Sequence, residues 1–276
     1  MNARLNALAY GMLGTLEDAE EVVQEARLRL HTSNPKPDNE EAYLYRLVSN
    51  LCIDRLRQLK VQRRAYFGPW LPEPVADDHV ATVDLAQQLS IGFLHLLEEL
   101  SPAERVSYVL REAFDYSHEE IAELLDISAA AARQRNSRAH RKLAGKVPPA
   151  ELSDQACKDM LEEMVSCIAR DDVDGLVNLL ADDVISYADG GGVVSAAIGP
   201  VTGRERIATV ILHLARKAIA EAGSQFSYER INGAWALVVR QGEQIHSVNL
   251  IAGEGGLINR IYTVRNPHKL TRLKAP

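Results

Sequence analysis

Guanidinium, amide and hydroxyl side chains at helical spacing lie between Tyr116 and Leu143, where the sequence predicts two short helices joined by a tight turn. The first helix has an apolar face made of Ile121, Ala122, Leu124 and Leu125. Ser128 is placed to cap the second helix. One stripe of the second helix is suited to packing and contains Ala132, Asn136, Ala139 and Leu143. The roughly opposite stripe can meet phosphates and base edges and contains Gln134, Ser137, Arg138 and Arg141.

This pattern favours a helix-turn-helix that binds DNA, although a basic surface helix of an all-α protein stays open from this segment alone. The net charge of −7 means that DNA binding must depend on local patches. Two such patches are present. The first runs from 46 to 64 and holds Arg46, Arg55, Arg57, Lys60, Arg63 and Arg64 against Asp54 alone. The second runs from 133 to 146 and holds Arg133, Arg135, Arg138, Arg141, Lys142 and Lys146 with no acidic residue.

A more specific resemblance involves the segment upstream. Residues 9–64 resemble region 2 of a bacterial sigma-70-type factor, and residues 96–143 resemble region 4, the pair found in extracytoplasmic-function (group IV) sigma factors. AYGMLGTLEDAEEVVQEARLRL matches the helix that binds the clamp of RNA polymerase in that family. AYLYRLVSNLCIDRLRQLK matches the helix that opens the promoter −10 element. The segments that resemble regions 2 and 4 occur in the family's order and are separated by a linker, which strengthens the resemblance.

Three short motifs narrow the resemblance to one subgroup. They are WLPEP within 68–74, ADGGG at 188–192 and NPHKL at 266–270. They are similar to motifs of the sigma factors that carry a fused SnoaL-like domain of the nuclear-transport-factor-2-like fold after region 4. Val193 stands where that subgroup usually has Lys or Arg. The implied protein is multidomain: two all-α sigma domains, at 1–67 and 83–146, joined by a linker at 68–82 and followed by an α+β SnoaL-like cone domain at 150–276.

The resemblance implies a role for each set of residues. Polymerase binding is expected at Asp18, Glu21, Gln24 and Glu25. Contact with the −10 element is expected at Asn50, Asp54, Arg55, Arg57 and Lys60. Recognition of the −35 element is expected at Ser128, Arg133, Gln134, Ser137, Arg138 and Arg141. Regulation in cis is expected at Trp70, Leu71, Pro72, Asp189, Gly190, Gly191, Gly192, Asn266, Pro267, Lys269 and Leu270.

The linker also invites a prediction of its own. A Trp and a Leu between prolines are expected to dock rather than swing freely, so we expect Trp70, Leu71 and Pro72 to lie against 189–192. The three glycines favour a loop that permits close backbone approach over a phosphate cradle, because no helix begins after them at the necessary spacing.

The C-terminal third predicts helices at 159–169, 172–180 and 203–220, followed by strands at 226–231, 234–240, 244–252 and 257–264. Helices followed by antiparallel hairpins predict a cone with either a ligand cavity or a filled core between the layers. Polar side chains on the expected strands are candidates for such a pocket: Tyr187, Asp189, Tyr228, His246, Arg260 and Tyr262. A catalytic site, a sensor pocket and a structural or interaction surface all stay open for this domain.

Cys52, Cys157 and Cys167 lie in apolar helical contexts without metal-like spacing, which predicts structural thiols in a reducing compartment. We expect a cytoplasmic protein with no membrane span, no cofactor, no metal and no catalytic residues. Its expected partners are core RNA polymerase and promoter DNA, with an unknown small molecule as a further candidate in the C-terminal domain. Two other functions are considered: a SnoaL-like cyclase or hydrolase, and a ligand-sensing repressor. Region 2 argues against both, since neither needs a clamp-binding helix.

Overall fold

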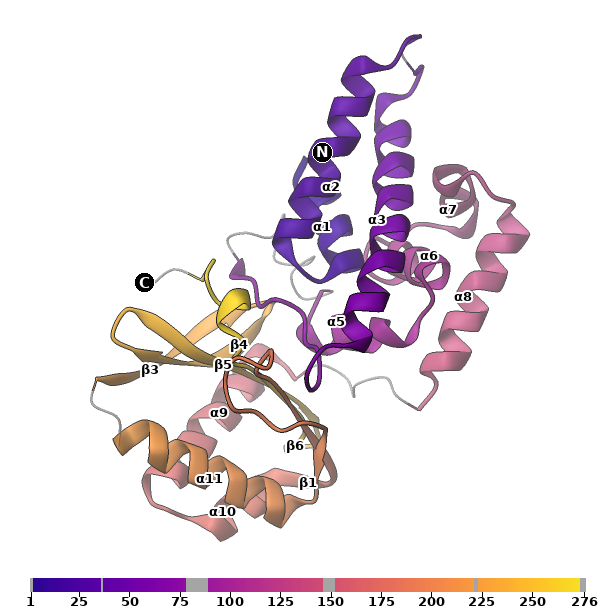
Figure 1. Ribbon diagram of the computed structural model, residues 1–276. Coiled ribbons are helices and arrows are strands. Elements are labelled where there is room, and N and C mark those ends of the chain that lie inside the picture. The colour runs from indigo at the N-terminus through magenta and orange to yellow at the C-terminus, as the bar shows by residue number, and fades with distance from the viewer. Residues whose placement is uncertain (1, 36, 78–88, 146–151, 221–222, 274–276) are drawn as a thin grey trace. The chain divides into compact units, whose positions relative to one another are not determined.

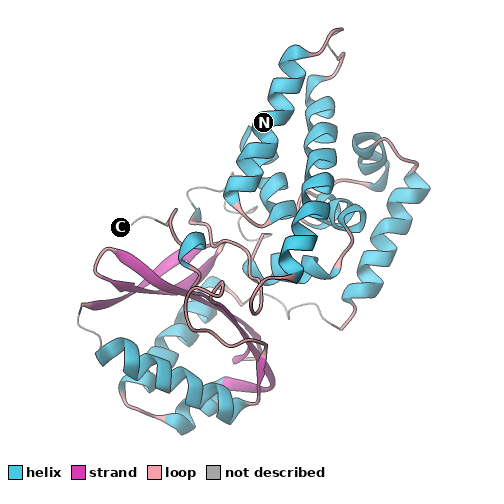
Figure 2. Cartoon of the chain, viewed as in Figure 1, coloured by secondary structure: helices cyan, strands magenta, loops and turns pink. Residues whose placement is uncertain are grey.

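The computed structural model describes residues 2–35, 37–77, 89–145, 152–220 and 223–273 (Figure 1). These residues fall into two compact units, one formed by Met1–Ala65 with Asp78–Val147 and the other by Tyr66–Asp77 with Pro148–Pro276. Figure 2 shows that the strands belong to the second unit, while the first is helical. The end of the expected linker, the start of the expected second sigma domain and Lys146 lie outside the described residues.

The first unit begins with α1 (Asn2–Leu13), α2 (Leu16–Thr32) and α3 (Glu40–Arg64), which pack against one another. Their contacting faces are apolar and buried, as with Leu8, Val22 and Val48. Asn39 caps α3 by accepting a hydrogen bond from the amide of Ala42 at 3.0 Å. A loop that contains Pro35 and Pro37 separates α2 from α3.

The rest of this unit comprises α5 (Ile91–Leu96), the 3-10 turn η2 (Leu97–Glu99), α6 (Pro102–Glu112), α7 (His118–Leu125) and α8 (Ala129–Leu143). Both α6 and α7 begin with capping boxes, formed by Ser101 with Glu104 and by Ser117 with Glu120. The predicted helix-turn-helix is confirmed as α7 and α8, with its expected apolar residues buried. Ser128 caps α8, accepting from the Ala131 amide at 3.1 Å.

The second unit contains α9 (Asp154–Ala169), α10 (Val173–Leu179) and α11 (Arg204–Ala220), which cover one face of a six-stranded sheet (Figure 1). The strand order is β2-β1-β6-β5-β4-β3. The strands are β1 (Leu180–Asp189), β2 (Val201–Thr202), β3 (Ser224–Ile231), β4 (Ala234–Gln241), β5 (Gln244–Glu254) and β6 (Leu257–Val264). A 3-10 turn, η3 (Pro267–Lys269), follows.

The antiparallel hairpins from β3 to β6 confirm the sequence prediction, and each observed strand agrees within two residues at either end. Asn232 and Gly233 both have positive φ, at 50° and 75°, as a tight hairpin turn requires. The sheet also contains β1, which was not among the four predicted strands and pairs in parallel with β6. A strand that pairs in parallel comes from a distant part of the chain, so no turn residues in the sequence predict the pairing.

Apolar side chains fill the space between the helices and the sheet. Met160, Leu161 and Met164 of α9 meet Leu237 and Ile251 of the sheet in this cluster. Of the two possibilities for the cone, this region is therefore a packed core.

Candidate functional site

The outer face of α8 carries the side chains predicted to contact DNA. Gln134, Ser137, Arg138 and Arg141 are exposed, opposite the buried stripe of the same helix. Arg133 is also exposed but pairs with Glu119 of α7 at 2.8 Å. The Ser128 hydroxyl caps the helix, so its hydrogen-bond acceptor is already used within the chain. This helix presents guanidinium, amide and hydroxyl groups on one accessible face, as base and phosphate recognition requires.

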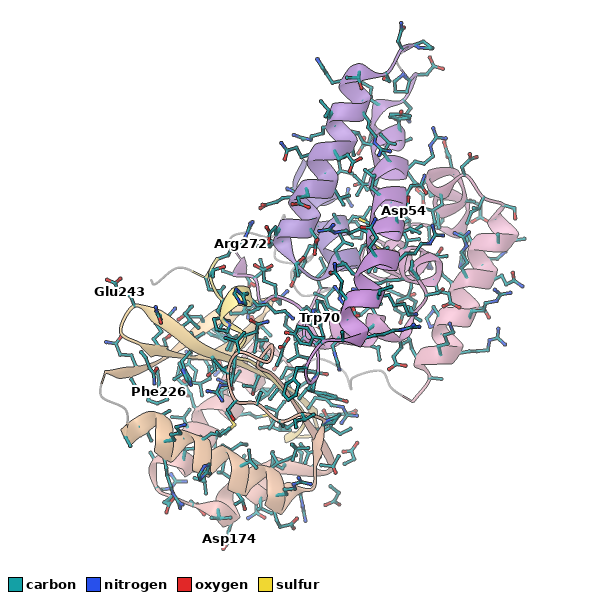
Figure 3. The ribbon with its side chains drawn as sticks, viewed as in Figure 1. Asp54, Trp70, Asp174, Phe226, Glu243 and Arg272 are labelled. Atoms are coloured by element: carbon teal, nitrogen blue, oxygen red, sulfur yellow. The ribbon has the colours of Figure 1, made fainter. Side chains whose placement is uncertain are left out.

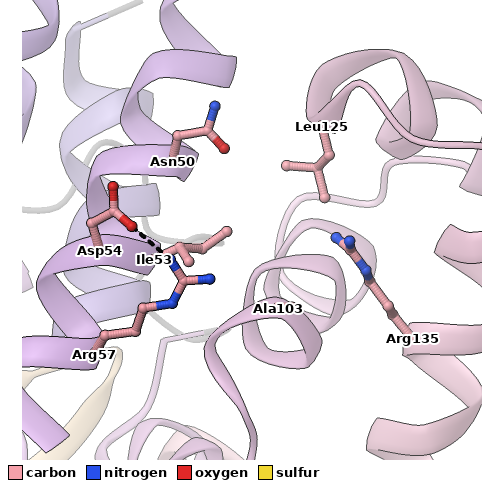
Figure 4. A pocket seen from close by; sticks show the side chains of 7 residues that line it. All are labelled: Asn50, Ile53, Asp54, Arg57, Ala103, Leu125 and Arg135. Atoms are coloured by element: carbon pink, nitrogen blue, oxygen red, sulfur yellow. Dashed lines mark hydrogen bonds and ion pairs between the residues drawn. The ribbon is translucent and has the colours of Figure 1, made fainter.

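On α3, three of the side chains predicted to contact the −10 element lie on one stripe. Asn50, Asp54 and Arg57 line an open cavity of about 400 Å³, and Arg57 pairs with Asp54 at 2.8 Å (Figure 4). Lys60 is exposed further along the helix. The remaining lining residues are Ile53, Ala103, Leu125 and Arg135. Arg135 belongs to the cationic patch of α8 but had not been assigned to a DNA-contacting face.

Arg55 does not join that stripe. Its guanidinium turns to α2, where Nε donates to Asp18 Oδ1 at 2.7 Å and Nη2 lies 3.5 Å from Glu21 Oε2. The hydrogen bond to Asp18 raises the pKa of Arg55. The Asp18 side chain is only 13 % exposed and also accepts a hydrogen bond from Thr15 at 2.6 Å. The structure thus brings one residue predicted for polymerase and one predicted for DNA together as an internal pair.

The other residues predicted for polymerase binding stand on the outside of α2. Glu21, Gln24 and Glu25 are exposed, and Glu25 makes an ion pair with Arg29 one turn away. These groups form an accessible acidic and amide surface beside buried Val22 and Val23.

In the second unit, the carboxylate of Asp189 is the centre of a hydrogen-bonded cluster. Asp189 ends β1 and is completely buried. It accepts hydrogen bonds from Tyr66 Oη at 2.5 Å, the Leu71 amide at 2.9 Å and Lys269 Nζ at 2.7 Å. The amide of Gly191 donates to the same carboxylate at 3.0 Å. The predicted contact of the linker with 189–192 is therefore confirmed for Leu71.

Lys269 binds the same segment in two further ways. Its ammonium donates to the carbonyl of Leu71 and lies 4.1 Å from the centre of the Trp70 ring. Asn266 donates to Tyr66 Oη at 2.8 Å, and its own backbone amide donates to the Asp189 carbonyl at 2.9 Å. The WLPEP, ADGGG and NPHKL segments thus meet in one cluster around the buried Asp189. We call this cluster the linker clamp: Tyr66, Trp70, Leu71, Asp189, Asn266 and Lys269.

The glycine loop beside the clamp permits close approach, as predicted. Gly191 and Gly192 have φ of 64° and 72°. A Cβ on Gly191 would lie 2.4 Å from Asn266 Nδ2, and one on Gly192 would lie 3.3 Å from Phe67 Cβ. Side chains at these positions would therefore push the linker and the tail away.

Comparisons with known proteins agree with this arrangement. The chain matches the family model of sigma-70 region 2 at residues 3–61 and that of sigma-70 region 4 at residues 91–143. It is 35 % identical over 225 residues to the ECF RNA polymerase sigma factor SigJ of Mycobacterium tuberculosis, an alignment that covers 79 % of this chain and 72 % of SigJ. The chain belongs to the extracytoplasmic-function sigma factors.

Two further similarities extend over nearly the whole sigma factor. A probable ECF RNA polymerase sigma factor of M. tuberculosis, SigI, is 28 % identical, covering 99 % of this chain and 93 % of SigI. The crystal structure of SigJ aligns with a TM-score of 0.78 and 29 % identity, covering 98 % of this chain and 95 % of SigJ. The protein is accordingly a factor that binds core RNA polymerase and directs transcription initiation at promoters, with a nuclear-transport-factor-2-like domain at its C-terminal end.

The residues proposed for a pocket in the sigma factor's C-terminal domain do not converge on one cavity. Tyr228 pairs across strands with Leu237, on the helix-covered face. Tyr262 pairs with Leu250 and stacks on Tyr187 at 5.7 Å, on the opposite face. Two more candidates contact groups outside the core, His246 beside Arg265 at 2.8 Å and Arg260 beside the Asp183 carbonyl at 3.3 Å. Strand alternation separates these side chains.

Several residues of the clamp and linker were missed by sequence reasoning. Tyr66 precedes the recognised motif, and only the fold brings its hydroxyl to Asp189. Val75 exchanges hydrogen bonds with Asn232, accepting from its backbone amide at 2.8 Å and donating to its side chain at 2.9 Å. Asp77 binds Arg230 at 3.2 Å. The hairpin turn around Asn232 was visible in the sequence, but its second role as a docking point was not.

The described residues contain no group of three or more His, Cys, Asp or Glu side chains arranged to hold a metal ion. Within the same ranges, no helix is long and apolar enough to cross a membrane. All three cysteines are free and buried. Burial raises the pKa of the Cys157 thiol to about 11.

Proposed function

We infer that the two exposed polar stripes divide promoter recognition between them. On α3, Asn50, Asp54, Arg57 and Lys60 contact the −10 element, and Arg55 supports that helix from behind. On α8, the −35 element is contacted by Arg133, Gln134, Ser137, Arg138 and Arg141, with Ser128 capping the helix. The observation that carries this proposal is the exposure of the polar stripe of α8 opposite a fully buried stripe. We divide the chain into four functional segments: region 2 at 1–67, the linker at 68–82, region 4 at 83–146 and the C-terminal domain at 150–276.

We expect polymerase to dock on the exposed acidic and amide face of α2. Glu21, Gln24 and Glu25 make direct contacts, while Asp18 acts by holding α3 through Arg55. A mixed polar and apolar helix face is suited to a protein interface.

The double substitution Glu21→Lys and Glu25→Lys tests this docking face. It reverses two charges, so co-purification with core polymerase should be lost while circular dichroism shows a folded protein. The control reverses two exposed acids of the second unit, Asp174 and Glu243, both labelled in Figure 3. Equal retention of polymerase by both double variants would contradict the assignment.

The linker clamp is proposed to regulate initiation in cis. The hydrogen bonds of Asp189 and Lys269 hold 66–71, where region 2 ends and the linker begins, on the C-terminal domain. Run-off transcription with core polymerase tests this by comparing the full chain, a chain lacking residues from Asn266 onward and a chain ending before Leu152. Both deletions should change promoter activity relative to the full chain. Activity identical in all three would contradict regulation by this clamp.

Enzymatic catalysis and a small-molecule ligand have no role in this proposal. The His and Asp considered as an acid/base pair, His246 and Asp189, make other contacts: the imidazole lies against Arg265, and the carboxylate accepts hydrogen bonds from the linker and tail. The helix-to-sheet space is filled by apolar side chains. Since the proposed partner is RNA polymerase on chromosomal DNA, we expect the protein to act in the cytoplasm.

A further inference from the structure

One arginine of α8 is held by a carboxylate of the neighbouring helix. Arg133 Nη1 donates to Glu119 Oε1 of α7 at 2.8 Å. Both side chains are exposed, Arg133 at 54 % and Glu119 at 67 %. An exposed ion pair contributes little to the stability of a fold. The Glu119–Arg133 pair is therefore accessible to an external partner and is of small value to the folded chain itself.

The helix-turn-helix fixes the backbone on both sides of this pair. Glu119 lies in the first turn of α7, whose start is set by the capping box of Ser117 and Glu120. Asp126 ends α7 in the left-handed region, at φ 54°, and Ser128 caps α8. The two helices pack against each other (Figure 1). The distance between the two side-chain origins is thus set by the motif, so the carboxylate can hold the guanidinium in a defined direction.

Arg133 also has a particular place along α8. It follows four alanines, Ala129–Ala132, at the N-terminal end of the helix, whereas Arg138 and Arg141 lie nearer the C-terminal end. In a helix-turn-helix, the N-terminal residues of the second helix contact base edges in the major groove. The small alanine side chains leave room for that approach. Arg133 is therefore the arginine of the proposed −35 set that is best placed to reach a base.

The Glu119–Arg133 pair presents two donors followed by an acceptor. Within the described chain, its hydrogen bond uses Nη1 and one carboxylate oxygen, which leaves Nε and Nη2 of Arg133 and the second oxygen of Glu119 for a ligand. In the major groove, a G·C base pair presents the complementary order: N7 and O6 of guanine accept, and the N4 amino group of the paired cytosine donates. An A·T base pair presents no two adjacent acceptors.

We propose that Glu119 and Arg133 together read one G·C base pair of the −35 element. The proposal rests on the −35 contacts assigned to α8 above. Arg133 donates to N7 and O6 of the guanine, and Glu119 orients the guanidinium and accepts from N4 of the cytosine. The charge of Glu119 also repels phosphates, which weakens binding to every DNA sequence. Since only the matching base pair compensates for that repulsion, Glu119 increases specificity while it lowers general affinity.

Selection from a promoter library tests this assignment. Polymerase holoenzyme made with the full chain selects from promoters randomised over the −35 element, and the selection is repeated with Glu119→Ala, Arg133→Met and Glu123→Ala. Glu123 is an exposed acid one turn further along α7 and provides the matched control. The wild type and Glu123→Ala should select the same G·C base pair at one position. Glu119→Ala and Arg133→Met should each lose that preference, by roughly 5- to 150-fold, and keep the preferences at other positions.

Two further measurements separate base reading from support of the fold. In the selected site, 7-deazaguanine lacks N7 and should weaken wild-type binding, whereas inosine keeps N7 and O6 and should bind as guanine does. The Arg133→Met variant should not distinguish 7-deazaguanine from guanine. On duplex DNA without a promoter, the Glu119→Ala holoenzyme should bind more tightly than the wild type, because a charge that repels phosphates is gone. Loss of a structural support would instead weaken binding to both kinds of DNA.

The outcomes distinguish this proposal from the proposed function. Selection of the same sequences by the wild type and Glu119→Ala would overturn the role of Glu119. Weaker binding of Glu119→Ala to promoter and promoterless DNA alike would do the same. An unchanged preference in Arg133→Met would overturn base reading by the pair, although −35 recognition by the rest of α8 would stand. If the wild-type holoenzyme selects no −35 sequence, the proposed function itself is wrong.

Discussion

The two units use charged side chains in opposite ways. On α8, Arg138 and Arg141 are exposed on the face opposite the buried stripe of the helix. In the second unit, Lys269 and Asp189 are 8 % and 0 % exposed and bind each other at 2.7 Å. Exposed cations suit an external, anionic partner, whereas a buried pair with several hydrogen bonds suits a fixed internal joint. Charge alone does not indicate a binding site; its burial and its partners decide the role.

The comparison predicts different consequences when a charge is removed. A buried charge that loses its partner stays desolvated, so the folded state is destabilised. An exposed charge is already solvated, so removing it changes stability little and weakens only the binding of an external partner.

Asp189→Asn should have the largest effect, because it leaves the buried Lys269 ammonium without its carboxylate. We expect the clamp to lose about 3–5 kcal/mol. Trp70, which lies over Lys269, reports linker release by fluorescence once the other tryptophan is changed by Trp235→Phe. Urea titrations should show an earlier Trp70 transition. Asp171→Asn, which removes an exposed ion pair with Arg216, serves as control. An equal, small shift of the urea midpoint in both variants would contradict the distinction between buried and exposed charges.

Glu104 is an intermediate case between buried and exposed charges. Its side chain is buried in the helical unit, yet it pairs with half-exposed Lys142 at 2.6 Å. Burial alone would raise the pKa of Glu104, but hydrogen bonds from Lys142 and Ser101 outweigh it and lower the pKa from 4.5 to about 2. The depressed pKa stabilises the fold fully above pH 4.5, and this contribution is lost as the pH falls toward 2. Glu104→Gln should therefore cost about 2–3 kcal/mol at pH 7.

The pH dependence checks the cause of that loss. Urea unfolding of the two proteins, followed by circular dichroism, should converge as the pH is lowered from 5 toward 2. Glu119→Gln, which removes an exposed pair with Arg133, should cost less than about 1 kcal/mol. A difference between wild type and Glu104→Gln that does not change with pH would point to altered packing instead.

Arg138→Ala and Arg141→Ala address the exposed side of the comparison. Each should weaken promoter binding by about 1–3 kcal/mol if it contacts a base edge, and by less, with unchanged sequence preference, if it contacts only phosphate. Binding of the polymerase holoenzyme to promoter variants at several salt concentrations distinguishes these outcomes. Thermal unfolding should stay unchanged. Wild-type transcription by the double variant would exclude this face from recognition.

Asn136→Leu should have the smallest effect, and in the stabilising direction. Asn136 is 3 % exposed on the buried stripe of α8, and both of its amide atoms lack a hydrogen-bond partner among the described residues. Replacing an unsatisfied amide with an apolar group of similar size should stabilise the helical unit by about 1 kcal/mol. Urea unfolding measures this change. A destabilised variant would contradict this expectation.

The amino-acid sequence by itself determined the local elements of this protein. Helical periodicity predicted α7, α8 and the buried stripe that includes Ala132 and Leu143, because a 3.6-residue repeat needs no distant contact to be recognised. The hairpins from β3 to β6 followed from alternation and turn residues. The promoter-contacting and polymerase-contacting residues were assigned through family motifs, and their roles stay predictions.

Only the tertiary structure decided which polar residues pair. Asp18 and Arg55 are 37 positions apart and were assigned to different partners, yet they bind each other. Tyr66, Leu71, Asp189 and Lys269 come from three separate segments of one unit. The parallel pairing of β1 with β6 likewise joins distant segments. Local propensities determine each element, but which faces meet depends on how the whole chain buries its apolar surface, and that is a property of all contacts together.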